Sequence, residues 1–432
     1  MCAEVGSRKG GEQKWSTVTE LEYNWCRPAA SGGTSRAKVR RTGKSLKFDP
    51  LSPEWIDDPY VFYSRLRHNE PVLRDDNLGA YLLFSYADCA AVLRTTDDFA
   101  TDPARLGRDF PAIRKSIQLI DPPENTALRK ATAEAIHAGF SALSATTGGL
   151  TEVVAKALFF ARHADRPVDL ITEFSKPLCL WVMCGVLGAR QPDPDWFAEV
   201  SDRMVFGMDY GFRPDALEPS LSAKRELSEL TDSWLDEHRD SVFFGTLLGV
   251  ATTYTRDVVA NSVRVVLHAG YSSVSGLIEN LLLHLLVERE MFEEHRERLL
   301  ESKAARITAI EEMIRYDSPV QVSKRLTVED LELSGVDVPR GADVIALIGA
   351  ANRDPTVFAE PDQMNLLRTP NPHLGFGRGP HACLGANLSI ELGSAVLKAF
   401  LVEQPNMRLA AHPVRRKTAS IRGLASLPVW LE

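Results

Sequence analysis

Apolar residues recur at helical spacing through the middle of the chain. They return every three or four positions in four segments: 150–162, 169–187, 193–207 and 220–238. This is the pattern of helices that bury one face. Strand-like alternation is confined to the early residues 72–86, to 326–355 and to a closing hairpin at 418–431. The pattern predicts a mainly α protein with a small β portion.

The longest helical run spans residues 255–290 and is apolar on nearly every side. A helix of that kind is buried all round and therefore predicts an axis through the centre of the molecule. Small and hydroxyl residues interrupt it at 268–273, where a glycine allows close approach and a serine can bend the helix. A tight crossing with another helix and a functional site are equally good interpretations of this interruption.

Residues 1–46 follow no such periodicity and are rich in Gly, Ser, Lys and Arg. Six basic residues with few apolar partners fall within 36–47: Arg36, Lys38, Arg40, Arg41, Lys44 and Lys47. We expect a disordered basic tail over 1–46 and a single folded domain over 47–432. A solvated extension is the simpler interpretation, and a site for nucleic acid or an acidic partner is the alternative.

Composition and charge narrow the class of protein. The 50 basic and 58 acidic residues leave a net charge of −8, which gives no global electrostatic case for nucleic acid. The six cysteines are scattered without a CxxC pair, which argues against a zinc site or a disulfide framework and favours a reducing, cytoplasmic compartment. No apolar run is long enough to predict a membrane anchor or signal peptide.

One cysteine lies where its thiolate would be stabilised. Residues 373–392 place Cys383 between glycines and aromatic residues, directly before a helical pattern. A helix N-terminus lowers the pKa of a thiol placed there, and the glycines leave room for a large flat ligand. A buried cysteine that caps an ordinary helix is the simpler alternative.

The spacing Phe376-x-x-Gly379-x-x-x-Cys383-x-Gly385 resembles the haem-binding loop of cytochromes P450. The resemblance extends in order over about 48–432 and implies the cytochrome P450 fold, with the long helix over a haem. It implies that Cys383 is the proximal thiolate ligand of the iron of haem b. Phe376 and Gly377 would lie against the cofactor.

The same resemblance assigns cations to the two haem carboxylates. Arg129, in a predicted helix over 121–140, Arg325 and His381 would neutralise them. The family has a histidine four residues before that first arginine, and this chain has Asn125 there, which is a departure.

The interruption of the long helix resembles the oxygen-binding segment of the family. Ala269 and Gly270 match its pattern, whereas Ser272 stands at the acid position and Ser273 at the alcohol position. Ser273 still provides a hydroxyl, but no carboxylate stands at the acid position. Proton delivery would therefore need water or a substrate hydroxyl. For His268, a packed histidine is the simpler interpretation and an acid or substrate contact is the alternative.

Glu312 and Arg315 lie one helical turn apart. The resemblance implies a buried ion pair between them, completed by Arg368, that holds the haem loop. The resemblance also predicts a substrate pocket formed by 96–120 and 193–225, with five further residues: Val265, His268, Val320, Gln321 and Val322.

The resemblance implies a monooxygenase-type oxidoreductase that uses dioxygen on a small-molecule substrate in specialised-metabolite biosynthesis. Hydroxylation or a related ferryl-dependent step is the expected outcome, with oxidative coupling or cyclisation without oxygen insertion as an alternative. We find no flavin or nicotinamide domain, so electrons should come from a separate ferredoxin or flavodoxin and its reductase, docked on a basic face that includes Arg129, Lys130 and Arg378. A non-catalytic haem-bearing scaffold or sensor, and a haem-free helical binding protein, are the rival classes.

Overall fold

The computed structural model describes residues 48–108, 115–162, 165–249, 253–404 and 406–431. The predicted basic tail over 1–46 lies outside the described residues. No helix of the described residues is long and apolar enough to cross a membrane.

The described chain is mostly helical, as its periodicity predicts. The helices are α2 (Pro53–Asp57), α3 (Tyr60–Asn69), α4 (Tyr86–Arg94), α5 (Thr126–Thr147), α6 (Leu150–Ala161), α7 (Lys176–Leu187), α8 (Pro194–Met208), α9 (Leu217–Glu237), α10 (Val242–Leu248), α11 (Arg256–Val287), α12 (Arg289–Glu294), α13 (Arg296–Glu301), α14 (Lys303–Tyr316), α15 (Ile348–Ala351) and α16 (Ala386–Glu403).

The strands are short and lie mainly at the two ends of the sequence. They are β1 (Val72–Asp75), β2 (Ala80–Leu83), β3 (Phe99–Ala100), β4 (Val168–Asp169), β5 (Val322–Thr327), β6 (Leu331–Leu333), β7 (Val336–Val338), β8 (Asp343–Leu347), β9 (Arg408–Leu409), β10 (Val414–Arg415), β11 (Leu424–Ser426) and β12 (Pro428–Trp430). The expected mainly α fold with a small β portion is confirmed.

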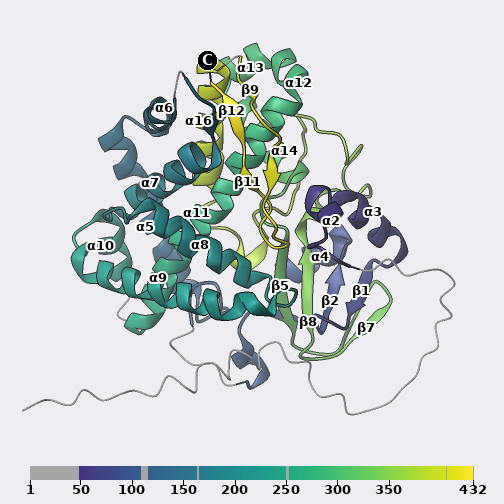
Figure 1. Cartoon of the computed structure of the whole chain (residues 1–432). Helices are drawn as coiled ribbons and strands as arrows, with labels where there is room; N and C mark the ends of the chain where they lie inside the picture. Colours follow the sequence, from purple (N-terminus) through teal and green to yellow (C-terminus); the bar gives the residue numbers. More distant parts are fainter. Residues whose placement is uncertain (1–47, 109–114, 163–164, 250–252, 405, 432) are drawn as a thin grey trace, which may run out of the picture.

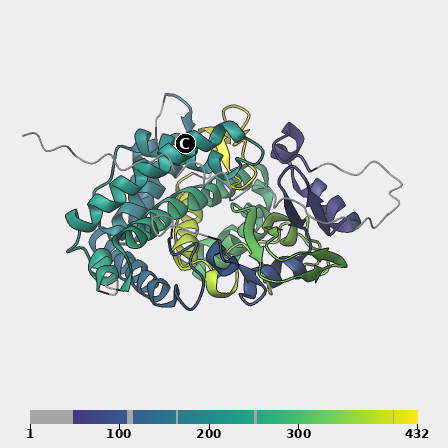
Figure 2. The same ribbon diagram turned by 90° about the horizontal axis from the view of Figure 1, so that it is seen from below.

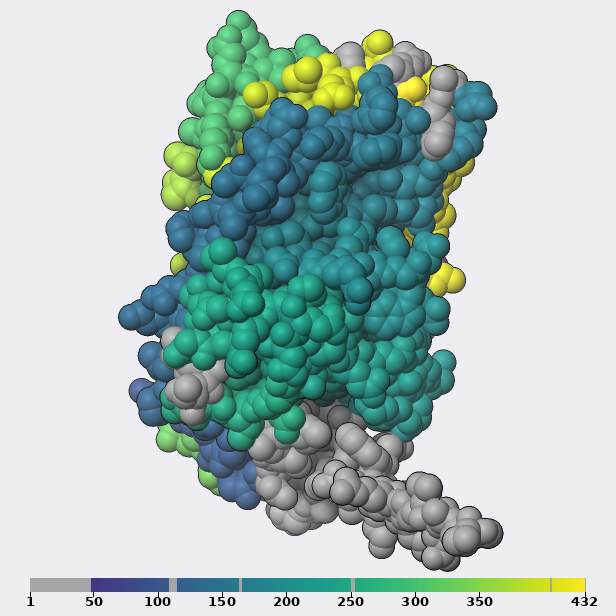
Figure 3. All heavy atoms as spheres, turned by 90° about the vertical axis from the view of Figure 1, so that its left-hand side faces the viewer, coloured from purple at the N-terminus to yellow at the C-terminus, as the bar shows by residue number. Residues whose placement is uncertain are grey.

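The molecule has a helical side and a sheet side, which lie next to each other in two views (Figures 1 and 2). The five-stranded sheet has the order β1-β2-β8-β5-β3, so strands from before and after the long helical region share it. Only its β2–β8 pair is parallel, with Tyr81 opposite Val344. On the helical side, the surface is formed mostly by the segments between α5 and α10 (Figure 3).

Helix α11 is the axis of the helical side. Its N-cap Thr255 accepts a hydrogen bond from the Val258 N–H, and the helix is buried along most of its length. It packs against α7, α9, α14 and α16. The expected long central helix over 255–290 is therefore present as Arg256–Val287, and α12 begins two residues later.

Three expected elements differ from the observed ones. The segment predicted as one helix over 169–187 begins with β4 and a five-residue π-helical turn before α7 starts at Lys176. The helix predicted from 121 begins at Thr126. The predicted closing hairpin is absent, because β11 pairs with β10 while β12 pairs with β4 and β9. For the hairpin, strand partners distant in the sequence decide the local structure.

The crossing of α5 and α7 generates a prediction about packing. A Cβ at Gly139 would lie 2.0 Å from the Val186 carbonyl oxygen, which is backbone and has little freedom to move. Gly139→Ala should therefore lower the free energy of unfolding by about 1–3 kcal/mol, as overpacking does. Urea titrations followed by circular dichroism measure this.

Gly245→Ala on α10 is the matched control, because its added Cβ would have no neighbour closer than 3.7 Å. Alanine also favours helix over glycine by about 1 kcal/mol. This variant should be as stable as the wild type or more so. Equal stabilities of the two variants would contradict the close α5–α7 contact.

Candidate active site

Cys383 lies in a tight loop directly before α16. The loop closes through the Cys383 N–H, which donates to the Phe376 carbonyl oxygen at 2.8 Å. Gly379 has a φ of +70°, and a Cβ there would lie 2.7 Å from the Arg94 carbonyl oxygen at the end of α4. Only glycine suits this position, because both the left-handed backbone and the close contact exclude a side chain.

The Cys383 thiol is open, whereas the other described cysteines are buried. Cys89, Cys179 and Cys184 pack in apolar surroundings, and burial raises the pKa of each thiol. Among the described residues, Cys383 is therefore the cysteine that a ligand can reach.

Electrostatics at Cys383 correct one expectation from the sequence. Burial by the surrounding protein raises the pKa of the Cys383 thiol, and the Gly385 N–H and the Arg129 guanidinium only partly oppose it. The residue as a whole is nevertheless exposed to solvent. The free thiol is therefore neutral at pH 7, and a metal would have to displace its proton.

Helix α11 has one open face at its centre. Ala269 is exposed although most residues of this helix are buried. Val265 and Ser273, one turn to either side, are half-buried. Positions four apart share a helix face, so Val265, Ala269 and Ser273 form one partly open strip, which we call the α11 strip.

The two serines at the centre of α11 bond within the helix. Ser272 Oγ donates to the His268 carbonyl oxygen at 2.9 Å, and Ser273 Oγ donates to that of Ala269 at 2.7 Å. Ser272 is buried and Ser273 is half-buried. Of the two hydroxyls, Ser273 therefore belongs to the open face and Ser272 lies off it.

Gly270 has a packing contact that its expected place in an oxygen groove did not include. A Cβ there would lie 2.4 Å from the Met183 sulfur on α7. The missing side chain therefore permits the close α7–α11 crossing, which was the structural alternative for this segment.

His268 is a packed residue. Its Nε2 lies 3.4 Å from the Ser201 carbonyl oxygen on α8. Burial lowers the pKa of His268 to about 4, with the Arg264 charge as a smaller contribution. The imidazole is therefore neutral near pH 7, which is consistent with the simpler interpretation of this residue.

The three cationic side chains expected to bind the haem carboxylates lie in two groups, one beside Cys383 and one beside Asp121. Arg129 on α5 lies beside the cysteine and donates a hydrogen bond to the Ala382 carbonyl oxygen. Arg325 on β5 and His381 share a second neighbour, Asp121. Arg325 Nη1 donates to Ser323 Oγ and to the Lys324 carbonyl oxygen, which leaves most of its donors for another acceptor.

Asp121 is a site residue that the sequence analysis missed. Its Oδ1 lies 2.7 Å from His381 Nε2, and its carboxylate accepts from the N–H groups of Thr101 and Asp102. Burial alone would raise the pKa of Asp121, but hydrogen bonds from His381 and Thr101 lower it to about 2. The only sequence signal is an acid directly before Pro122.

Asn125, which replaces the histidine of the family pattern, hydrogen-bonds to the backbone. Its Nδ2 donates to the Ile120 carbonyl oxygen at 2.7 Å and the residue is buried. It therefore fixes the segment that leads into α5.

Glu312 on α14 is the centre of a buried ion-pair network. Its carboxylate accepts from Arg315 Nε at 2.7 Å and Nη2 at 2.8 Å, and both side chains are fully buried. Arg368 Nε lies 3.1 Å from the same carboxylate. The Asn365 N–H and Asn371 Nδ2 also donate to it. The structure thus brings together the three residues assigned to this pair.

The expected pocket residues at 320–322 differ in their burial and in their partners. Val320 and Val322 are half-buried, and Val320 bridges Ile421. Gln321 is buried, and its side chain hydrogen-bonds to Tyr60, Tyr63 and the Ser318 carbonyl oxygen. It therefore serves the sheet side of the molecule and not the expected substrate pocket.

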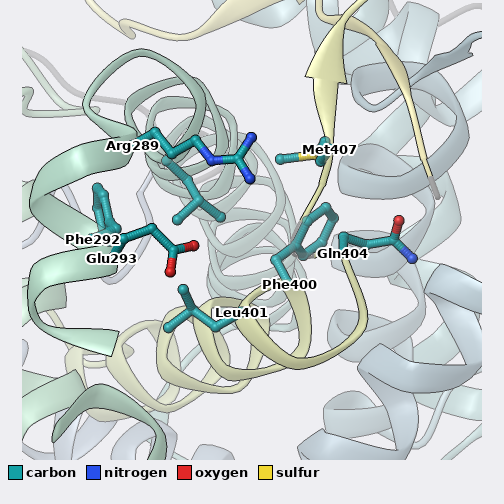
Figure 4. A pocket seen from close by; sticks show the side chains of 8 residues that line it. Arg289, Phe292, Glu293, Phe400, Leu401, Gln404 and Met407 are labelled. Atoms are coloured by element: carbon teal, nitrogen blue, oxygen red, sulfur yellow. The ribbon is translucent and has the colours of Figure 1, made fainter. Parts of the chain in front are cut away.

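A small pocket elsewhere is separate from these residues. Leu401, Phe400 and Met407 line it with Arg289 and others near the end of α16 (Figure 4). Cys383 lies before the other end of this 18-residue helix, about 27 Å away at 1.5 Å per residue. This pocket therefore forms no part of the candidate site.

The site geometry meets one requirement of a haem, which is an accessible thiol that becomes a thiolate when iron displaces its proton, with cations nearby. Cys383 can supply the ligand and Arg129 and Arg325 can supply cations for acidic groups. A Cβ at Gly377 would be in ordinary contact with the His381 carbonyl oxygen at 3.8 Å, and the φ of +64° there favours glycine. The residues present fit this cofactor.

The buried Glu312 network generates a stability prediction. Glu312→Gln removes the one carboxylate that faces both Arg315 and Arg368. Leaving buried charges without a partner should lower the free energy of unfolding by about 3–5 kcal/mol, which denaturant titration measures. Asp236→Asn is the control, because it weakens an exposed pair with Arg256 and should barely change stability. Similar losses in both variants would contradict the prediction.

The raised pKa of Cys383 generates a pH prediction for the haem-free protein. A thiolate forms only above the thiol pKa, so alkylation of Cys383 by iodoacetamide should rise at higher pH than that of a cysteine in an unfolded peptide. Mass spectrometry of the Cys383 peptide follows the rate. A midpoint at lower pH than the peptide reference would show that the helix N-terminus outweighs burial.

Comparisons with known proteins identify the family of this chain. The family model for Cytochrome P450 matches residues 222–403. The vitamin D(3) 25-hydroxylase of Pseudonocardia autotrophica is 30% identical over 412 residues, which cover 89% of this chain and 96% of the relative. The biotin biosynthesis cytochrome P450 of Bacillus subtilis is 27% identical, over 88% of this chain and 98% of that protein.

Solved structures show the same architecture. The crystal structure of CYP109E1 from Bacillus megaterium in complex with testosterone has a TM-score of 0.79 and 25% identity, and covers 88% of this chain and 100% of that chain. CalO2 has a TM-score of 0.75 and 26% identity, over 89% and 98% of the two chains. This chain therefore belongs to the cytochrome P450 family, and is an oxidoreductase with a haem-iron cofactor that acts on a substrate with dioxygen.

Proposed function

We propose that the chain is a haem-thiolate monooxygenase that oxidises a small molecule of specialised metabolism, with Cys383 as the proximal ligand of haem b. The observation that carries the proposal is the open thiol of Cys383 at the start of α16, in a chain whose other described cysteines are buried. An accessible sulfur in a loop of fixed geometry is what an axial ligand requires.

Arg129, Arg325 and His381 are the proposed partners of the haem carboxylates. Arg129 lies beside Cys383, and the other two meet at Asp121. Asp121 orients the His381 ring and balances part of the local positive charge. Phe376 and Gly377 in the loop and Ala269 on the α11 strip are the proposed apolar contacts.

The bound haem iron supplies the redox chemistry that activates dioxygen and oxidises the substrate. The chain places the substrate and manages protons. Ser273 on the α11 strip is the hydroxyl that can hydrogen-bond a water or a substrate group, after turning from the Ala269 carbonyl oxygen. Ser272 is buried and carries no acid, so the protons come from water or from a substrate hydroxyl.

Hydroxylation is the proposed outcome. The named activities of relatives include vitamin D(3) 25-hydroxylation, and others carry names that place them in biotin or polyketide biosynthesis. They support a biosynthetic role for this chain. One solved structure, 25% identical to this chain, is described as a cytochrome P450 for C–S bond formation. Oxidative coupling is therefore the second candidate, because this chain has Ser272 in place of the usual acid.

Electrons are proposed to come from a separate ferredoxin or flavodoxin and its reductase. Of the three basic residues expected at the docking face, Lys130 is exposed, whereas Arg129 and Arg378 are half-buried and hydrogen-bonded to Ala382 and Pro372. Lys130 is therefore the most accessible of the three. A cytoplasmic location is supported by the unpaired state of the four described cysteines.

We also propose that 47–432 is one domain. Asp317, directly after α14, accepts from Tyr60 on the sheet side and from Arg422 near the C-terminus. Buried bonds between distant parts of the sequence support a single folding unit.

The carbon monoxide difference spectrum of the reduced protein tests the thiolate assignment. The wild type should give the long-wavelength Soret band of a thiolate-ligated haem, and Cys383→Ser should lose it because an alcohol does not replace the thiolate. Cys184→Ala is the matched control, because this cysteine is buried in the core, and should keep the band. Absence of the band in well-folded wild type would overturn the proposal.

The serine pair is tested by product formed per electron consumed, once a substrate shift is found. Ser272→Asp restores a carboxylate at the acid position and should raise coupling, because it adds a proton donor beside the α11 strip. Ser273→Ala removes the hydroxyl of the α11 strip and should lower coupling several-fold. Unchanged coupling in both variants would show that these positions have no role in proton delivery.

A further inference from the structure

The carboxylate of Asp121 joins segments that are distant in the sequence. It accepts from the N–H groups of Thr101 and Asp102 and from the Thr101 hydroxyl, at 2.5 to 3.2 Å. Its Oδ1 also lies 2.7 Å from Nε2 of His381, in the loop that carries Cys383. Asp121 is buried, with 4% of its surface exposed. One enclosed carboxylate therefore connects the segment after β3, the segment before α5 and the Cys383 loop.

Thr101 and His381 also contact each other at this carboxylate. Thr101 Oγ1 lies 3.1 Å from His381 Nε2 and donates to Asp121 Oδ1 at 2.5 Å. The hydroxyl, the ring nitrogen and the carboxylate oxygen thus form a closed triangle of polar atoms. Buried hydrogen bonds that share atoms strengthen one another, so a shift of the His381 ring disturbs the Thr101 contacts as well.

Asp102 carries the connection into the next turn of the chain. Its N–H donates to Asp121 Oδ2 at 3.0 Å. Its side chain accepts from the Ala104 N–H at 2.9 Å and so caps a short 3-10 helix, η1 (Pro103–Leu106). These residues belong to the loop over 96–120 that is predicted to cover the substrate. The segment 101–106 is therefore held from its first two residues by Asp121.

Asp121 lies among the three cations proposed for the haem carboxylates. Besides its contact with His381, its charge acts on Arg325 of β5, a strand that pairs with β3 directly before Thr101. Its carbonyl oxygen accepts from the Asn125 N–H, which begins the turn into α5. Helix α5 in turn carries Arg129.

The carboxylate is charged, and it leaves donors free for a second anion. Burial would raise the pKa of Asp121, but hydrogen bonds from His381 and Thr101 lower it to about 2. Arg325 donates to Ser323 and to the Lys324 carbonyl oxygen and not to Asp121. A haem carboxylate can therefore bind Arg325 without displacing any hydrogen bond of Asp121.

We propose that Asp121 is a positioning residue that couples the segment 101–106 to the haem site through His381. Its carboxylate holds the His381 ring and, with the same two oxygens, the backbone of Thr101 and Asp102. Such a coupling free energy is reciprocal. A haem carboxylate that fixes His381 therefore also stabilises the start of the loop predicted to cover the substrate. The inference rests on the proposed role of His381 toward the haem.

Hydrogen exchange of the backbone amides in 101–106 measures this coupling in the haem-loaded protein. D121N and H381Q should each speed exchange at least about twofold, the rate change that matches the smallest coupling energies of residues in contact. The double variant D121N/H381Q should exchange no faster than D121N, because the connection is already cut. An unchanged rate in either single variant, or additive effects in the double variant, would overturn the proposal.

Asp102→Asn is the matched control for the loss of a negative charge. It keeps the N–H that donates to Asp121, and the asparagine oxygen can still cap Ala104. This variant should exchange like the wild type, and H381Q should act in it as in the wild type. If D102N speeds exchange as much as D121N does, charge alone explains the effect and the proposal is wrong.

Thr101→Val keeps the question open to test if D121N does not fold. It retains the buried carboxylate and removes only the hydroxyl that contacts both Asp121 and His381. In this background H381Q should speed the exchange of 101–106 less than it does in the wild type. An undiminished effect of H381Q would contradict the coupling.

Transfer of haem to apomyoglobin observes the same coupling from the cofactor side. Thr101 has no proposed contact with the haem, yet T101V should release haem faster than the wild type, because the coupling acts in both directions. D102N should release haem at the wild-type rate. A role of Thr101 confined to local structure predicts equal release from T101V and the wild type, and that result would overturn the proposal.

The carbon monoxide spectrum distinguishes this inference from the function on which it rests. An intact thiolate band in the wild type, together with additive exchange effects, overturns only the role of Asp121. Absence of the band in well-folded wild type overturns the proposed function, and with it the haem-dependent coupling. An intact band with non-additive exchange effects supports both.

Discussion

The buried carboxylate of Glu312 is the interaction on which the placement of the cysteine loop depends. It compensates Arg315 and Arg368 together, and Arg315 in turn donates to carbonyl oxygens of Asn352, Pro361 and Gln363. The side chain of Asn352 accepts from the Leu374 N–H at the start of the loop. A chain of buried polar contacts thus runs from α14 to the segment that carries Cys383. Such a network positions a ligand and takes no part in its chemistry.

The Cys383 loop and helix α11, which form the two sides of the candidate site, are held in place by different interactions. On the cysteine side, the backbone bond from Cys383 to Phe376 and the close contact at Gly379 leave little freedom. On the α11 side, polar residues occur along one line of a mostly apolar helix, from Asn261 through Arg264 to Ser272, and all are buried. Their hydrogen-bond partners are carbonyl oxygens of α11 and α8, Ser228 on α9 and the Lys115 carbonyl oxygen. The cysteine loop is thus held by its backbone, whereas buried side-chain hydrogen bonds hold the polar line of α11 in place.

Local patterns predicted the parts of the protein that local interactions determine. The buried helix α11 could be predicted because its apolar run is visible in its own sequence. The loop at Cys383 could be predicted because its residues follow one another at a fixed spacing. Asp121 was missed because its partner His381 lies 260 residues away. Gln321 was expected in the pocket, and its orientation is decided by Tyr63, 258 residues earlier in the chain. The acidity of Cys383 was misjudged because burial comes from the whole fold, whereas the helix dipole is visible in the sequence.

Iron-edge X-ray absorption of the ferric, haem-loaded protein tests the central claim most directly, because it reports the atoms bound to the iron. The account predicts one sulfur neighbour of the iron in the wild type. It predicts only nitrogen and oxygen neighbours in Cys383→Ser. A wild-type spectrum without sulfur, or a sulfur neighbour that persists in Cys383→Ser, would contradict the assignment of Cys383 as the ligand.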